Sequence, residues 1–480
     1  MGLDLDLSRP ASVLFVAPEC APLTKTGGLG DVCGALPAAL RAEGVDVRVL
    51  MPGYPAVLDG CGPAKRRRLT LLGKQASLAE AELPNGVPLL VLECAELYAR
   101  PGGPYLSPDG HDWPDNALRF GVLSKAAAAL AGAASPIAWR PEVVHCNDWP
   151  CGLAPAFVRF DGAPAATLMT VHNLAFQGLF DASWVGRLGL PPQSYAIDGV
   201  EFYGRMSFLK GGLSYADALS TVSPTYAKEI QTPELGCGLD GLLRHRSAAL
   251  HGILNGIDDA AWNPASDAHL PACYDAASLE RKAQNKAGLQ AHFGLPVSKD
   301  EPLFGLVGRL TEQKGIDLVV SAADRLAALG QLVILGSGER ALEAAVAGLG
   351  RRYPGRIAAR IGFDEGLAHR IEAGADLFLM PSRFEPCGLN QMYSQRYGTP
   401  PIVRATGGLA DTVEDNITGF VFGQPDVGEL VEAAARAVRC YRDPKTWRAV
   451  QRAAMGRDFS WSAAARLYAG LYRALAALPR

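Results

Sequence analysis

Short, continuous apolar runs alternate along this chain with longer Ala/Leu-rich stretches, and this alternation restricts the fold more than any other feature. The runs end at Gly, Pro or acidic loops. Strands of this kind are buried on both faces of a parallel sheet, with helices packed on either side. The predicted strands are residues 12–17, 45–51, 88–93, 142–146 and 166–171 in the first half, and 303–307, 331–335, 357–361, 376–380 and 400–404 in the second.

The segment from about 250 to 302 interrupts this rhythm with Asn-Gly, Asn-Pro and Leu-Pro turn signals. We therefore predict an α/β protein of two doubly wound, Rossmann-like domains, over residues 1–250 and 251–461 of the 480. Ligands of open parallel sheets bind beyond the carboxyl ends of the strands. We expect one ligand site in the cleft where two such domains face each other.

Composition excludes several other classes of protein. The net charge, 46 − 49 = −3, is too balanced for a chain whose main partner is nucleic acid. The ten cysteines include no C-x-x-C pair and follow no signal peptide, which favours reduced thiols in a cytoplasm. No Cys/His cluster has zinc spacing, so we expect no bound metal. The longest uncharged stretch, 126–139, is too short for a membrane span and predicts a core helix and loop.

A Gly-rich segment, Lys25 to Val32, follows the first predicted strand by a long loop and precedes an apolar helix predicted for Cys33 to Leu40. Glycines let backbone N–H groups approach an anion, and a helix N-terminus and a lysine add positive charge. The segment therefore suits a phosphate or diphosphate. The alternative is a Gly-rich turn without a ligand. Gly28, Gly30 and Gly34 do not have the spacing of a dinucleotide fingerprint.

Arg309 and Lys314 follow the first strand of the second half, in the block G-R-L-T-E-Q-K-G. Two cations at the carboxyl end of a strand can converge on one diphosphate, the arginine through a planar fork and the lysine as a point charge. The alternative is a pair of solvated basic residues in a loop. Their position at the predicted cleft favours the diphosphate.

Glu385 lies between Phe384 and Pro386 in a loop after the strand 376–380, which predicts a restricted, partly dry pocket. A carboxylate there can hold sugar hydroxyls or stabilise positive charge at an anomeric carbon. It could equally be a helix N-terminal acid that the helix dipole stabilises. Cys387 has no histidine near it in the sequence and is expected to be inert.

Asp148 and His172 each follow a strand of the first half, where binding residues collect in this architecture. Both side chains could bond sugar hydroxyls. The alternative for the histidine is a satisfied core residue. The nearby aromatic residues Trp149, Tyr98 and Trp113 are usually packing residues, although sugar faces do stack on such rings.

Taken together, these blocks resemble those of bacterial glycogen synthases and plant starch synthases, which are retaining glucosyltransferases that elongate α-1,4-glucan from a nucleotide sugar. The resemblance runs almost end to end and keeps the order of the family. It is carried by P-E-C-A-P-L-T-K-T-G-G-L-G-D-V (18–32), T-V-H-N-L-A-F-Q-G (170–178), G-R-L-T-E-Q-K-G (308–315), S-R-F-E-P-C-G-L-N-Q (382–391) and R-A-T-G-G-L-A-D-T-V (404–413).

The resemblance implies a GT-B fold in which the last helix, 462–480, crosses back to complete the first domain. It implies that the donor diphosphate is surrounded by Lys25, Gly28, Arg309, Lys314 and the loop Thr406, Gly407 and Gly408, with no metal. The catalytic set is predicted as Glu385, His172, Arg309, Lys314 and Asp148. Further predicted substrate-binding residues are Glu19, Asp31, Asn173, Tyr98, Asn255, Cys387, Gly388 and Leu389.

By the same resemblance we expect a bacterial cytoplasmic enzyme that transfers glucose from ADP-glucose to the non-reducing 4-OH of an α-1,4-glucan with retention. No cofactor, nucleic acid or membrane is expected to take part. Retention can arise by same-face attack, which we favour, or through a covalent intermediate. The rival readings are a glycogen phosphorylase, a GT-B enzyme that makes disaccharides, and a catalytically silent glucan-binding protein.

Overall fold

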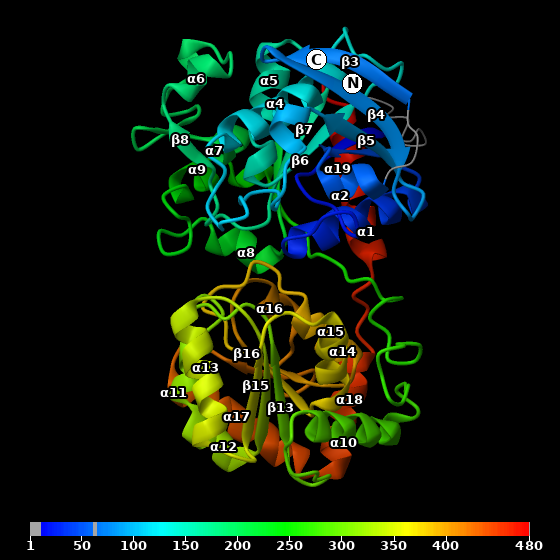
Figure 1. Cartoon of the computed structure of the whole chain (residues 1–480), viewed down its shortest axis with the longest axis vertical. Coiled ribbons are helices and arrows are strands. Elements are labelled where there is room, and N and C mark those ends of the chain that lie inside the picture. The colour runs from blue at the N-terminus through cyan, green and yellow to red at the C-terminus, as the bar shows by residue number, and fades with distance from the viewer. Residues whose placement is uncertain (1–10, 61–64, 480) are drawn as a thin grey trace. The chain divides into compact units, whose positions relative to one another are not determined.

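The computed structural model describes residues 11–60 and 65–479. Contacts divide the chain into two units, each built around a sheet (Figure 1). The first unit runs to Gly256 and takes up the chain again from Trp461, and the second unit is Ile257–Ser460. Among the described residues no helix is long and apolar enough to cross a membrane. The described cysteines are all free, and Cys61 lies outside the described residues.

The sheet of the first unit has nine strands in the order β12-β11-β7-β6-β1-β2-β5-β4-β3. The predicted strands are all present and all pair in parallel with one another. Their apolar runs are buried as expected, since both faces of the central strands are covered. The bounds are β1 Ser12–Val16, β2 Asp46–Pro52, β3 Lys65–Leu71, β4 Lys74–Glu82, β5 Pro88–Glu93, β6 Val143–Asn147, β7 Ala166–Val171, β11 Ala218–Thr221 and β12 Leu250–Gly252.

The strands that the pattern missed are short or belong to the antiparallel extension of the sheet. β3 and β4 pair antiparallel and extend the sheet past β5. β3 has the sequence KRRRLTL and is mostly exposed, so no apolar run marks it. A separate three-stranded antiparallel sheet consists of β8 Leu179–Asp181, β9 Glu201–Phe202 and β10 Arg205–Ser207.

Helices of the first unit follow most of the parallel strands. The first of them begins at Gly28 and not at Cys33, so the predicted Gly-rich loop supplies its first turn. The predicted core helix ends at Ala131, before Pro136. The bounds are α1 Gly28–Ala42, α2 Pro55–Gly60, α3 Ala95–Tyr98, α4 Asn116–Ala131, α5 Ala154–Phe160, α6 Trp184–Arg187, α7 Phe208–Tyr215, α8 Pro224–Glu229, α9 Asp240–His245 and α19 Trp461–Ala476.

The C-terminal helix α19 packs on the first unit against α1, β6 and β7. Its Tyr472 hydroxyl lies 2.7 Å from Nδ1 of the buried His145, whose Nε2 lies 2.6 Å from Thr170 Oγ1. Burial holds the pKa of His145 well below its usual range, so the ring is neutral. His145 is thus a satisfied core histidine that ties α19 to the sheet.

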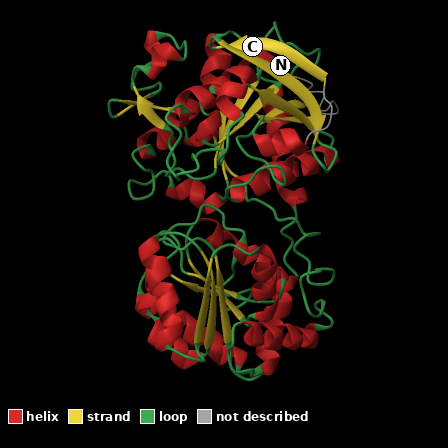
Figure 2. Cartoon of the chain, in the orientation of Figure 1, coloured by secondary structure: helices red, strands yellow, loops and turns green. Residues whose placement is uncertain are grey.

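The second unit has a six-stranded, all-parallel sheet in the order β15-β14-β13-β16-β17-β18. Figure 2 shows helices on both sides of it. Its strands are β13 Leu303–Val307, β14 Gln331–Gly336, β15 Ile357–Ile361, β16 Leu377–Met380, β17 Pro401–Arg404 and β18 Phe420–Phe422. Its helices are α10 Lys282–His292, α11 Ile316–Ser321, α12 Ala323–Leu329, α13 Arg340–Arg352, α14 Glu365–Gly374, α15 Asn390–Arg396, α16 Gly407–Thr412, α17 Val427–Tyr441 and α18 Pro444–Met455.

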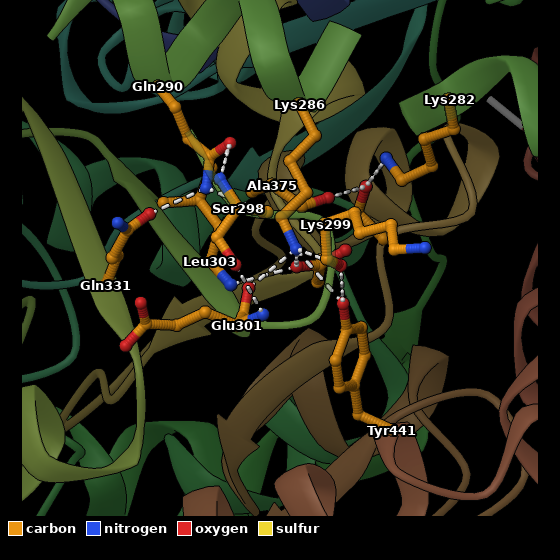
Figure 3. Close-up of polar contacts among 12 residues, drawn as sticks. Lys282, Lys286, Gln290, Ser298, Lys299, Glu301, Leu303, Gln331, Ala375 and Tyr441 are labelled. Atoms are coloured by element: carbon orange, nitrogen blue, oxygen red, sulfur yellow. Dashed lines mark hydrogen bonds and ion pairs between the residues drawn. The ribbon is translucent and has the colours of Figure 1, made fainter. Parts of the chain in front are cut away.

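A buried polar cluster fixes α10 to the amino ends of the strands of this sheet (Figure 3). Lys286 Nζ lies 2.7 Å from Asp376 Oδ2, and that carboxylate also accepts from the Leu303 N–H at 2.9 Å. Lys282 Nζ donates to the Ala373 carbonyl at 2.7 Å, at the end of α14, as a capping cation does. Because the cluster lies at the amino ends, the carboxyl ends stay clear for other residues.

Candidate active site

Most of the predicted site residues of the first unit follow the carboxyl ends of β1, β6 and β7. Glu19 comes after β1, is 3% exposed, and accepts a hydrogen bond from the Tyr105 hydroxyl at 3.1 Å and another from the Thr26 N–H. Burial raises its pKa. Lys25 Nζ lies 2.7 Å from Asp31 Oδ1. The Gly-rich segment therefore pairs its lysine with an acid in the first turn of α1.

Asp148 follows β6 with φ of 59° and ψ of 178°, a backbone conformation that is adopted almost only by glycine and is strained for an aspartate. Its Oδ1 accepts from the N–H groups of His172 at 2.9 Å and Asn173 at 3.4 Å. Burial raises the pKa of this carboxyl to about 7. The structure thus brings three predicted residues together.

The ring of His172 is held by Asn147, a residue that the sequence analysis did not select. His172 Nε2 lies 3.0 Å from Asn147 Oδ1, and Asn147 Nδ2 donates to the Val16 carbonyl at 3.1 Å. Because the amide nitrogen already donates, the amide oxygen must accept, so the proton is on Nε2 and Nδ1 is left as an acceptor. Burial lowers the pKa of His172 to about 3, which keeps the ring neutral.

The other predicted residues of the first unit differ in their surroundings. Asn173 Oδ1 accepts from the Ala175 N–H at 3.1 Å and caps a local turn. Asn255 is buried in the segment after β12. Tyr98 is 1% exposed, and its hydroxyl donates to the Arg119 carbonyl at 2.7 Å. Because the ring of Tyr98 is buried and its hydroxyl already donates to a carbonyl of the same unit, the tyrosine offers no surface to a substrate in this structure.

In the second unit, Glu385 is 5% exposed and its Oε2 forms an ion pair with Lys314 Nζ. The same oxygen accepts from Ser382 Oγ at 3.1 Å. The next helix, α15, begins only at Asn390, so side chains and not a helix N-terminus satisfy this carboxylate. The carboxylate of Glu385 is therefore buried against a lysine.

Arg309 follows β13 and is exposed. In the part of the chain that the structure describes, no side chain or carbonyl is recorded as a partner of its guanidinium, whereas Lys314 is paired with Glu385. The carboxyl end of β13 therefore carries one compensated and one uncompensated cation.

The predicted loops 385–389 and 406–408 pack backbone against backbone. A Cβ at Gly407 would overlap the Glu385 carbonyl, and one at Gly408 would overlap the Cys387 carbonyl. Gly407 also has φ of 45°. Gln391 Nε2 donates to the carbonyls of Cys387 and Gly388, both at 3.0 Å. Leu389 directly precedes α15, and Thr406 is fully buried before α16. Glycine is needed at both positions, because a side chain at either one would keep the two loops from packing this closely.

Phe363 is a further residue that the sequence analysis did not select. It follows β15 at the same carboxyl edge and is 80% exposed. Its place directly after a predicted strand was the signal that could have identified it. Among the described residues, no group of three or more His, Cys, Asp or Glu side chains could hold a metal ion.

Comparison with known proteins gives full-length matches. The starch synthase catalytic domain family matches residues 12–245, and the glycosyl transferases group 1 family matches residues 290–454. The chain is 55% identical to a glycogen synthase of Aromatoleum aromaticum, over 97% of each chain. It is 53% identical to one of Nitrosospira multiformis, over 96% of this chain and 97% of that one. The catalytic domain of starch synthase IV from Arabidopsis thaliana, solved with ADP and acarbose, aligns with a TM-score of 0.86 and 32% identity over 98% of this chain and 100% of that one.

Proposed function

The chain belongs to the glycogen synthase family and has the GT-B fold, and on that premise we propose that it transfers glucose from ADP-glucose to the non-reducing 4-OH of an α-1,4-glucan with retention. The resemblance noted in the sequence and the predicted fold are confirmed by these matches. The donor, the acceptor position and the stereochemistry are the proposal. The observation that carries it is the pairing of Lys314 with the buried Glu385, together with Arg309 after the same strand, for whose guanidinium the described residues give no partner.

Breaking the bond between a sugar and a diphosphate places negative charge on the leaving ADP and positive charge on the anomeric carbon. Arg309 and Lys314 stabilise the first charge, and they act mainly in the transition state, where that charge develops. Glu385 stabilises the positive charge on the anomeric carbon or accepts hydrogen bonds from sugar hydroxyls. The Lys314–Glu385 ion pair brings the cation and the carboxylate next to each other.

On the sugar side, His172 contributes a hydrogen-bond acceptor and not a charge. Its Nδ1 is free to accept from a sugar hydroxyl, since Nε2 donates to Asn147. Asp148 has one oxygen engaged by backbone N–H groups and can accept from a second hydroxyl through the other. The other proposed substrate contacts of the first unit are Lys25, Gly28, Glu19, Asp31, Asn173 and Asn255.

Phe363 supports a nucleotide as part of the donor. An exposed aromatic ring at the carboxyl edge of a parallel sheet offers a flat face on which a base can stack. Phe363→Leu is expected to raise KM for the donor and to leave kcat nearly unchanged.

We further propose that the reaction needs no metal or other cofactor, takes place in the cytoplasm, and proceeds by same-face attack in which the departing ADP helps to deprotonate the acceptor. No Asp or Glu is assigned to the opposite face of the sugar as a nucleophile. Detection of a glucosylated carboxylate by mass spectrometry would contradict same-face attack.

The test is release of ADP from ADP-glucose in the presence of glycogen, with UDP-glucose as the alternative donor and EDTA added in a parallel reaction. We expect turnover with ADP-glucose, weaker turnover with UDP-glucose, and no loss with EDTA. The Lys314→Ala variant is expected to lose about 10²- to 10³-fold in kcat. Glycogen binding without any ADP release would indicate a silent glucan-binding protein and overturn the proposal.

A further inference from the structure

Lys314 and Glu385 are carried by loops that follow different strands. Lys314 lies between β13 and α11, whereas Glu385 lies between β16 and α15. Their ion pair is one contact between two long side chains, which by itself does not fix where the two charges lie. Some other feature must join the loops.

Arg383 makes that connection with its side chain. Its guanidinium binds both carboxylate oxygens of Asp317, with Nη1–Oδ1 and Nη2–Oδ2 each at 2.6 Å. Nη1 also donates to the Glu312 carbonyl at 2.8 Å. A planar fork bound to a carboxylate in this way specifies both distance and orientation. Glu312 and Asp317 stand on either side of Lys314 in the sequence.

The backbone around Arg383 adds to the same connection. The Arg383 N–H donates to the Gln313 carbonyl at 2.8 Å, and Gln313 Nε2 donates to the Phe384 carbonyl at 3.3 Å. The Arg383 carbonyl accepts from Arg404, which extends the connection to the end of β17. Residues next to Lys314 are therefore bound to residues next to Glu385.

The exposure of the fork argues against a role mainly in stability. The side chains of Arg383 and Asp317 are 29% and 37% exposed, so solvent screens their attraction. An ion pair of this kind adds little to the free energy of folding. Its effect is to fix the distance and orientation between the two loops.

We propose that Arg383, anchored by Asp317, is a positioning residue that holds Lys314 and Glu385 in the arrangement that glucosyl transfer needs. The inference rests on the proposed function, in which those two residues act in the transition state. Arg383 lies in the block S-R-F-E-P-C-G-L-N-Q, and its guanidinium is turned toward Asp317 and Glu312.

The test is a set of paired substitutions read out as kcat and KM. Arg383→Met is expected to lower kcat about 10- to 100-fold, because a misplaced charge loses its effect steeply with distance. KM for ADP-glucose and for glycogen should change by less than about threefold, because the loss concerns the transition state. Arg383→Lys keeps the charge but not the fork, so it is expected to restore little of the lost kcat.

The decisive measurement repeats Arg383→Met in the Lys314→Ala background. If Arg383 works by placing Lys314 against Glu385, its removal should lower kcat by a clearly smaller factor in this background than in the parent, since one of the two groups that it places is gone. A general loosening of the unit would lower kcat by the same factor in both backgrounds. Thermal unfolding of each variant reports on the fold separately.

Arg436 offers a matched control within the same unit. It binds both oxygens of Asp415 at 3.1 and 3.2 Å and donates to the Val421 carbonyl, with side-chain exposures of 27% and 43% for Arg436 and Asp415. Among the described residues, its hydrogen-bond partners are Asp415, Asn416 and Val421, which lie outside both loops. Arg436→Met is expected to leave kcat unchanged in both backgrounds.

Three outcomes decide the matter. Unchanged kcat in Arg383→Met, equal losses in both backgrounds, or full rescue by Arg383→Lys would each overturn the positioning role. If Lys314→Ala itself keeps the parent rate, the proposed function fails together with this inference. If Lys314→Ala is impaired and the Arg383→Met loss is additive, only the inference about Arg383 fails.

Discussion

Replacing Asp148 with asparagine should make the protein more stable and less active. The carboxyl is 8% exposed, and burial raises its pKa to about 7, whereas an aspartate in an unfolded chain titrates near about 3.9. Asparagine keeps an oxygen that can accept from the His172 and Asn173 N–H groups but cannot ionise. The backbone strain at φ of 59° and ψ of 178° is common to both residues, which have nearly the same shape, so it does not enter the difference.

The sign of the effect follows from proton binding. Between about pH 4 and 7 the folded protein holds the Asp148 proton more tightly than the unfolded chain does, so the contribution of Asp148 to stability falls as the pH rises. Above pH 7 the loss is complete. A difference of roughly 3 pH units at 1.36 kcal/mol each gives an upper value of about 4 kcal/mol.

The assay is thermal unfolding of Asp148→Asn and of the parent from pH 4.5 to 8.5. At about 2 °C per kcal/mol for a large domain, the variant should unfold up to about 8 °C higher at pH 8, with the difference shrinking toward pH 4.5. Its rate of ADP release should fall at least tenfold, because the proposed sugar contact changes from a charged to a neutral acceptor. A difference that is the same at every pH, or a variant less stable than the parent at pH 8, would refute the reasoning.

Asp443 provides a control of opposite sign. Its carboxylate caps α18 and accepts from Thr446 Oγ1, which holds its pKa below the usual range. Stability from such a group is present at neutral pH and is lost as the pH falls through the folded pKa. Asp443→Asn should therefore be less stable than the parent at pH 8, with the difference shrinking at low pH.

Three further predictions concern other parts of the structure. The ring of His172 should stay neutral with its proton on Nε2 from pH 5 to 8, and Asn147→Ala should lose that tautomer preference, as nitrogen-detected NMR of labelled histidine would report. Gly407→Ala should lower both stability and kcat because a Cβ overlaps the Glu385 carbonyl, whereas Gly348→Ala in α13, where the space is open, should raise stability by up to about 1 kcal/mol in denaturant titrations. Tyr472→Phe should lower the stability of the first unit by about 1 to 3 kcal/mol, because it leaves one nitrogen of the buried His145 without its partner; an unchanged denaturation midpoint would contradict that role.

The central strands could be predicted from sequence because their signal is local. β1 and β13 are continuous runs of apolar residues, because both of their faces are buried and so polar residues do not alternate with apolar ones. β3 could not be found in this way, since its Lys and Arg residues are exposed at the edge of the sheet. The start of α1 was misplaced because glycines are poor helix formers, yet here they supply its first turn.

The candidate site, too, could be predicted from the sequence only in part. Position at a strand end identified Glu385, His172 and Asp148 as candidates, and their roles stay predictions. What the sequence could not supply is which groups pair, because the partners are distant in the chain. Lys314 and Glu385 are separated by 71 positions, and His172 and Asn147 by 25. Such pairings depend on strand order, which a single sequence leaves open.

Two of the buried aspartates in the described part of the chain, Asp376 and Asp148, differ in how their charge is compensated. Asp376, at the amino end of β16, is compensated by the Lys286 ammonium and the Leu303 N–H, so its burial holds α10 in place. Asp148, at the carboxyl end of β6, has two backbone N–H groups, and in the described part of the chain no lysine or arginine pairs with it. Burying a carboxylate without a cation lowers stability. That loss lies at the edge of the sheet where parallel α/β folds generally bind ligands, and we predict that a sugar hydroxyl donating to Asp148 would recover part of it.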